Sequence, residues 1–141
     1  VRYYFKDKQG FEMAMLDDGV ETLLSGLPAE GDFEAVFAAV VAGLNVMPWF
    51  PLLVMRTVYV SDSLRAHFIA THVPRMAAKL GFNLQGDKYS RLSIISMLIF
   101  PQLARGALGP ALGIEYNNTF ATEYGKHVAG LVSHKSNQES S

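Results

Sequence analysis

The side chains best suited to chemistry in this sequence are two histidines, His67 and His72, and two carboxylates, Asp17 and Glu21. Residues five apart on an α-helix face different sides, so the two histidines are expected to be poor co-ligands of a metal. The two carboxylates are four apart and share a helix face, where a surface pair is favoured over a catalytic pair. We therefore predict no metal site.

Sequence motifs give no support for an enzyme. The chain has no cysteine, which excludes thiolate catalysis and cysteine metal sites. It lacks the zinc-protease, calcium-loop, nucleophile-elbow and phosphate-loop patterns. Ser93 and Ser96 lie in an apolar segment, where bonds to their own helix carbonyls are favoured over a nucleophilic role. We predict that the protein is not an enzyme and that it needs no cofactor.

Composition favours one globular domain. The 141 residues are 50% hydrophobic and 18% charged, with a net charge of −1, so whole-chain electrostatics does not favour nucleic acid. No signal peptide is recognisable, which predicts a cytoplasmic protein. Residues 35–55 carry no charge, but Pro48 and Pro51 interrupt them. This favours a buried helix over a membrane span, and we expect no membrane association.

The hydrophobic period and the Gly and Pro positions predict six helices, over residues 8–25, 33–47, 50–60, 61–81, 87–108 and 119–133. Pro74 and Pro101 lie inside the fourth and fifth and should kink them. The second has an alanine-glycine face that another helix could approach closely. The polar residues that follow 133 are expected to be disordered.

Charge is unevenly placed along the chain. Residues 9–55 contain seven acids and no base, whereas the fourth predicted helix carries Arg65, His72, Arg75 and Lys79 along one side. Two solvated faces of opposite sign that partly neutralise each other are the favoured interpretation. A cation-binding pocket near Glu34 is the alternative.

The first sixteen residues carry the most specific pattern, VRYYFKDKQGFEMAML. Arg2, Tyr4, Lys6 and Lys8 form a cluster of donors of the kind that contacts DNA phosphates. The segment resembles the end of the DNA-binding region in the TetR/AcrR family of transcriptional regulators. There an aromatic string closes the recognition helix, and a K-D-K turn opens a long linking helix. LSIISMLIFPQLARGALGPALG and EYGKHVAGLV are similar to the last two helices of that family.

The resemblance implies an all-α, six-helix TetR-like C-terminal domain whose last two helices form a four-helix bundle with a partner. Residues 1–7 would be the remnant of a mostly missing helix-turn-helix region, 8–133 the effector-binding and dimerisation domain, and 134–141 a disordered tail. The implied function is ligand-responsive regulation of transcription, with repression as the expected mode. Operator DNA would be reached only through the missing N-terminal region. A helical lipid- or metabolite-binding protein without a DNA role is the alternative, and a cofactor-free helical enzyme is a weaker one. The coding sequence ahead of Val1 would separate the first two.

Two residue sets follow from this interpretation. A small hydrophobic effector is expected in an apolar pocket between the second to fifth helices, with a fully packed core as the competing outcome. Asn45 is expected to make the polar contact within this pocket. The expected lining residues are Phe37, Val41, Asn45, Trp49, Met55, Tyr59, Val73, Met76, Met97 and Phe100. The expected homodimer interface contains Phe120, Tyr124, His127, Val128 and Leu131.

Overall fold

The computed structural model describes residues 8–28, 33–80 and 88–140, and within these ranges the chain is all-α without strands. The predicted fold class is therefore confirmed at this level. The elements in chain order are α1 (Lys8–Ser25), α2 (Phe33–Val46), α3 (Trp49–Val60), α4 (Asp62–His67), the π-helical turn η1 (Phe68–His72), α5 (Val73–Leu80), α6 (Lys88–Leu103), α7 (Arg105–Leu112) and α8 (Asn118–Ser140).

The first three helices follow the sequence expectation closely. α1 begins and ends where it was predicted, and α2 and α3 differ from prediction by their end residues only. Pro48 occupies the N-cap of α3 with φ −64° and ψ −19°. Pro51 lies in the first turn of α3, where backbone N–H groups have no partner within the helix. The proline therefore costs no helical hydrogen bond. The break between α2 and α3 therefore follows directly from these two prolines.

The fourth predicted helix is divided by η1. The ring of Pro74 has no N–H to donate and crowds the carbonyl four residues earlier, at Ala70. The helix widens just ahead of it, and the N–H of Val73 donates to the carbonyl oxygen of Phe68, five residues back. The kink expected at Pro74 thus takes the form of a π-helical turn.

The fifth predicted helix is two helices, which corrects the sequence expectation. α6 and α7 meet at Ala104 with a bend of 85°. Pro101 leaves the carbonyl of Met97 without its helical partner, and the Tyr124 hydroxyl donates to that oxygen at 2.6 Å. The Tyr116 hydroxyl likewise donates to the carbonyl of Pro101 at 2.7 Å. Side chains from beyond the bend therefore satisfy the backbone groups that the bend exposes.

The last helix, α8, is longer than predicted. The side chain of Asn117 accepts a hydrogen bond from the N–H of Phe120 at 2.9 Å and caps the start of α8. The helix continues to Ser140 instead of ending at Ser133. The polar segment 134–140 was expected to be disordered, but it contains no Gly or Pro that would stop a helix.

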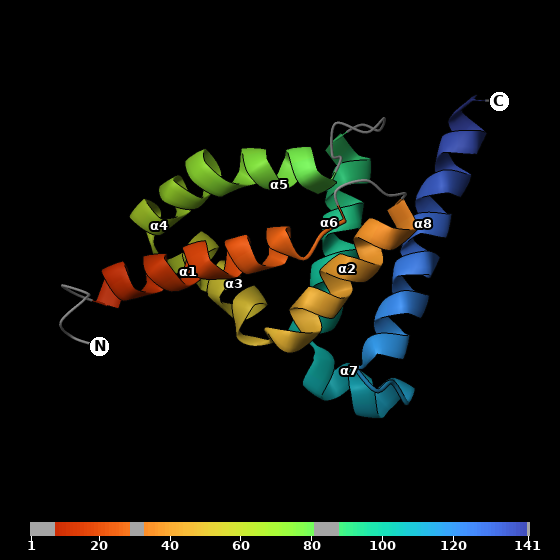
Figure 1. Cartoon of the computed structure of the whole chain (residues 1–141), viewed down its shortest axis with the longest axis horizontal. Helices are drawn as coiled ribbons and strands as arrows, with labels where there is room; N and C mark the ends of the chain where they lie inside the picture. The colour runs from red at the N-terminus through yellow and green to blue at the C-terminus, as the bar shows by residue number, and fades with distance from the viewer. Residues whose placement is uncertain (1–7, 29–32, 81–87, 141) are drawn as a thin grey trace.

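α2 and α8 pack closely along their lengths, as Figure 1 shows. A Cβ atom on Gly125 of α8 would lie 2.5 Å from the backbone nitrogen of Ala38 on α2. This confirms the close helix approach expected on the alanine-glycine face of α2. Glycine is required at this crossing because any side chain would push the two backbones apart.

The hydrophobic core lies between α2 and the helices around it. α4 and α5 run alongside α1, α6 packs behind α2, and α7 joins α6 to α8 (Figure 1). Among the described residues, the largest fully buried side chains include Leu16, Val20, Phe37, Val41, Leu44, Leu64 and Val128.

No single described helix is long and apolar enough to cross a membrane. Two bent pairs, α2 with α3 and α6 with α7, reach that length and apolarity only when the two helices of the pair are taken together.

Candidate functional site

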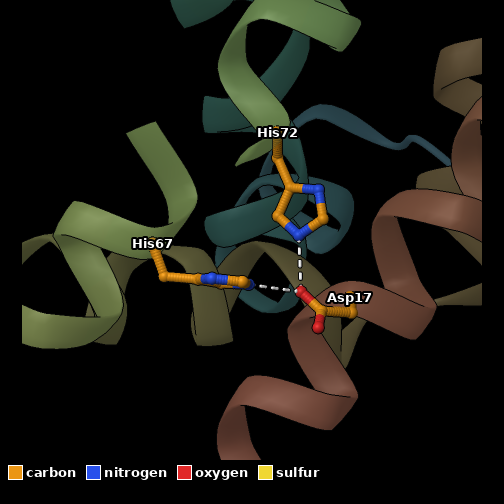
Figure 2. A group of neighbouring side chains, drawn as sticks. All are labelled: Asp17, His67 and His72. Carbon is orange, nitrogen blue, oxygen red and sulfur yellow. Dashed lines mark hydrogen bonds and ion pairs between the residues drawn. The ribbon is translucent and has the colours of Figure 1, made fainter. Parts of the chain in front are cut away.

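Three polar side chains converge between α1 and the segment from α4 to η1 (Figure 2). His72 donates its Nε2–H to Oδ1 of Asp17 at 2.5 Å, and His67 donates its Nε2–H to the same oxygen at 2.8 Å. The two imidazole rings are nearly perpendicular, with centroids 5.4 Å apart. We call these three residues the His–Asp cluster.

The His–Asp cluster overturns the expectation that His67 and His72 face different sides of a helix. That expectation assumed an α-helix, in which a separation of five residues turns the second side chain well away from the first. The intervening turn η1 is π-helical and has hydrogen bonds between residues five apart, so positions 67 and 72 lie nearly above one another. The signal in the sequence is Pro74, which predicts a kink but not the π-helical form that the kink takes.

The members of the cluster differ in their access to solvent. The His72 side chain is only 3% exposed, and its Nδ1 has no hydrogen-bond partner among the described residues. The Asp17 side chain is 43% exposed, and the His67 ring is half-buried. Burial raises the pKa of Asp17, but hydrogen bonds and positive charge from both histidines outweigh it, so the pKa lies below its ordinary value. The carboxylate is therefore charged near neutral pH.

The lowered pKa predicts an acid-sensitive contribution to stability. A carboxyl whose pKa is lower in the folded than in the unfolded state stabilises the fold fully above the unfolded value, 3.8, and loses that contribution as pH falls through the folded value. We expect the difference in unfolding free energy between the wild type and Asp17→Asn to shrink as pH falls below about 4. Chemical denaturation across this pH range measures it, with Asp18→Asn, an exposed neighbour, as the control. A difference that grows as pH falls below about 4 would contradict the prediction.

Further contacts tie α1 to its neighbours on both sides of the cluster. Arg75 of α5 pairs with Glu21 at 2.5 Å, and Arg56 of α3 pairs with Glu12 at 3.3 Å. Near the start of α1, the side chain of Gln9 donates to the hydroxyl of Ser63. The predicted neutralisation of an acidic face by a basic face is thus confirmed at the α1–α5 contact. Exposed pairs of this kind contribute only about 0–1 kcal/mol each, so they orient α1 more than they stabilise it.

The residues expected to line an effector pocket separate into three groups. Phe37 and Val41 are fully buried in the core. Trp49, Met76 and Met97 are partly buried and pack against that core, and Asn45 and Met55 are also partly buried. Tyr59, Val73 and Phe100 lie on the surface. Their placement inside an enclosed pocket is therefore wrong, because each lies on the outer side of its helix.

The polar contact expected of Asn45 is present, but within the chain. Its Oδ1 accepts a hydrogen bond from Nε2 of Gln102 at 2.7 Å, and its Nδ2 donates to the carbonyl of Asn117 at 3.2 Å. Gln102 is buried, and its Oε1 has no partner among the described residues. Sequence reasoning missed Gln102, although a lone amide in an otherwise apolar helix was a visible signal. This amide network joins α2, α6 and the start of α8.

The residues expected at a dimer interface are also divided. Val128 is fully buried within the chain, next to α2, so its assignment to a dimer interface is wrong. Phe120 and Tyr124 are partly buried against the core and stack with ring centroids 5.3 Å apart. His127 and Leu131 remain exposed on α8. The helix α8 therefore uses one face for its own core and leaves another open.

The remaining sequence predictions concern DNA phosphates and serines. Arg2, Tyr4 and Lys6 lie outside the described residues. Lys8 begins α1 with an exposed side chain 3.8 Å from Glu12. The hydroxyl of Ser96 donates to the carbonyl of Leu92 at 2.9 Å, which confirms the expected bond to its own helix.

Comparison with known proteins adds no relative: no family model, curated protein or solved structure matches the chain. The similarity to the TetR/AcrR family thus remains a prediction from the N-terminal pattern and the two C-terminal segments.

Proposed function

We propose that the chain is the effector-binding and dimerisation part of a ligand-responsive transcriptional regulator of the TetR/AcrR kind, a cytoplasmic homodimer that responds to a small hydrophobic effector. The observation that carries this proposal is a row of large apolar side chains on the outside of α6. Tyr89, Leu92, Ile95 and Phe100 are all exposed there. Such a row is the surface that a four-helix dimer bundle would bury.

Helical geometry explains why one chain leaves this row uncovered. Leu98 and Gln102 on one side of α6 are buried, and Ile94 and Met97 beside them pack against the core. Leu92 and Phe100 lie on the opposite side of α6. Their separation along the sequence places both on the same face of a helix. A helix that is apolar on both sides needs two cores, and a second copy of the chain supplies the missing one.

Support for regulation comes from the position of α1. In the proposed regulator, α1 follows directly from the residues that resemble the end of a DNA-binding region. Its contacts with α3, α4 and α5 mean that an effector displacing those helices would displace α1 as well. An effector must prefer the shifted state by the coupling free energy, typically about 1–3 kcal/mol. The apolar lining residues that remain for an effector site are the buried or partly buried ones, Phe37, Val41, Trp49, Met55, Met76 and Met97.

Dimerisation gives the direct test of this proposal. We expect Leu92→Glu to raise the dimer dissociation constant at least about 30-fold, corresponding to the roughly 2 kcal/mol of an interface hot spot. The reason is that two-fold symmetry places two carboxylates in one apolar contact. Sedimentation velocity over a concentration series measures the change. Leu112→Glu is the matched control, because Leu112 on α7 is 65% exposed and Leu92 is 62% exposed.

A wild-type chain that is monomeric at tens of micromolar would contradict the dimer. Equal effects of Leu92→Glu and Leu112→Glu would place the contact elsewhere. The regulatory role is tested with the full product of the gene, by selecting genomic fragments that it binds at physiological salt. Specific fragments released by an apolar small molecule support the proposal, whereas binding of the small molecule without any specific DNA supports the alternative of a metabolite-binding protein.

A further inference from the structure

We propose that Asp17, His67 and His72 bind a divalent transition-metal ion of the zinc class between α1 and the α4–η1 segment. The three candidate ligand atoms, two imidazole nitrogens and one carboxylate oxygen, all lie within 4.8 Å of one another. Imidazole and carboxylate ligands suit Zn²⁺ and its neighbours in the first transition row. The proposal stands on this geometry alone and does not depend on the proposed regulatory function.

Only a small movement would admit the ion. Zinc lies about 2.0–2.2 Å from its nitrogen and oxygen ligands, which separates tetrahedral ligands by about 3.3 Å. The present separations from Oδ1 of Asp17 are 2.5 and 2.8 Å, so each must open by less than about 1 Å. The two imidazole nitrogens, which lie within 4.8 Å of one another, must come to a separation of about 3.3 Å. Asp17 can provide the first movement because its side chain is 43% exposed, and the half-buried His67 ring can provide the second. The ion would replace the two N–H protons that both histidines now direct at one oxygen, and each proton would move to Nδ1 of its own ring or be released to solvent.

The surroundings hold the donors in position. His72 is buried and fixed by η1, so it forms the rigid side of the site. The Nδ1 of His67 lies 3.5 Å from the hydroxyl of Thr71, a group that can accept from Nδ1–H once Nε2 is bound to metal. π-Helical turns occur frequently at functional sites, and this one is what brings both nitrogens to the same place.

The arrangement also leaves access for the ion and for a further ligand. Figure 2 shows the second carboxylate oxygen of Asp17 turned away from both rings. Asp17 and His67 are partly exposed, so the ion can enter from solvent on their side. Three protein ligands leave one tetrahedral position for water or a small donor. Bound metal would crosslink α1 to the α4–η1 segment through direct bonds.

The experiment uses the whole chain, stripped of metal with a chelator and titrated with Zn²⁺ at neutral pH by calorimetry. We expect one Zn²⁺ per chain and a rise in the melting temperature on binding. Loss of a ligand in His67→Gln or Asp17→Asn should weaken binding at least about tenfold, the lower bound seen for groups that merely support a ligand. The matched controls Asp18→Asn and His127→Gln change exposed groups of the same types and should bind as the wild type does.

Co²⁺ absorption supplies a readout that a purely structural role would not change. The proposal predicts a visible ligand-field band in the wild type and both controls, and its loss in His67→Gln. His67 decides the outcome because its ring is only half-buried, so glutamine is tolerated more easily than at His72. Absence of Zn²⁺ binding, binding unchanged in His67→Gln, or binding lost in His127→Gln would each overturn the site.

Discussion

Replacing Phe37 with alanine is expected to lower the free energy of unfolding by about 3–5 kcal/mol. The side chain is 1% exposed in the centre of the core, and its ring stacks on Phe33 with centroids 5.9 Å apart. Truncation removes buried apolar surface and leaves a cavity that rigid helices fill only in part. Denaturant unfolding followed by circular dichroism measures the loss. The control, Phe100→Ala, removes a ring that is 58% exposed and should cost the isolated chain less than about 1 kcal/mol.

The size of this loss also discriminates between a packed core and a preformed pocket. If Phe37 borders an empty space, it has fewer packing contacts to lose, and the cost should fall below about 1.5 kcal/mol. That smaller value would contradict the packing described above and would favour an effector cavity beside Phe37. A loss equal to that of Phe100→Ala would show that burial of Phe37 contributes nothing measurable.

Replacing Gly125 with alanine is expected to destabilise the protein by about 1–3 kcal/mol or more. The new methyl group would lie 2.5 Å from the backbone nitrogen and 2.6 Å from the Cα of Ala38, so α2 and α8 must separate along their contact. Alanine favours a helix over glycine by up to about 1 kcal/mol, and the steric cost must exceed this gain. Thermal and denaturant unfolding measure the net effect.

Gly130 provides the matched control on the same helix. A Cβ atom at Gly130 would meet nothing within 4 Å, so Gly130→Ala should stabilise the chain by about 0.5–1 kcal/mol through helix propensity. Opposite signs for the two substitutions would establish the close α2–α8 contact. Stabilisation by both would contradict it, because no steric cost would then exist at Gly125.

Local helical structure was largely predictable from the sequence. α1 and α2 end near glycine or proline, α3 begins beside Pro48, and the buried stripe of α1 follows the 3.6-residue period. The alanine-glycine face of α2 predicted a close helix neighbour because small side chains permit close backbones. The double apolar face of α6 was also visible, since its hydrophobic residues outnumber what one core can cover.

The prolines show where sequence reasoning lost accuracy. A proline inside a helical pattern predicts a break or a kink but does not say which backbone geometry absorbs it. At Pro101 the result is a sharp turn into α7, because tyrosine hydroxyls from α8 and its preceding loop satisfy the freed carbonyls. At Pro74 the result is a π-helical turn. Each outcome depends on neighbours distant in sequence.

The exposed and buried positions of α8 were decided in the same way. The stripe through Phe120, Tyr124 and Val128 has a helical period that any apolar partner could satisfy. In the folded chain Val128 is buried in the core on the helix that packs against α2, and of the residues expected at the interface Leu131 and His127 stay exposed. A period in the sequence identifies a face that must be buried, but it does not identify the partner.

The helical class, most helix ends and the apolar surplus of α6 were therefore predictable, because they depend on spacing along a single element. The meeting of Asp17, His67 and His72 depends instead on how the helices pack. Their convergence requires a π-helical turn that changes the angular relation of residues 67 and 72, and a parallel placement of α1 that brings residue 17 beneath them. Neither condition can be derived from the spacing of residues along one helix. Both depend on how the chain around Pro74 packs against α1.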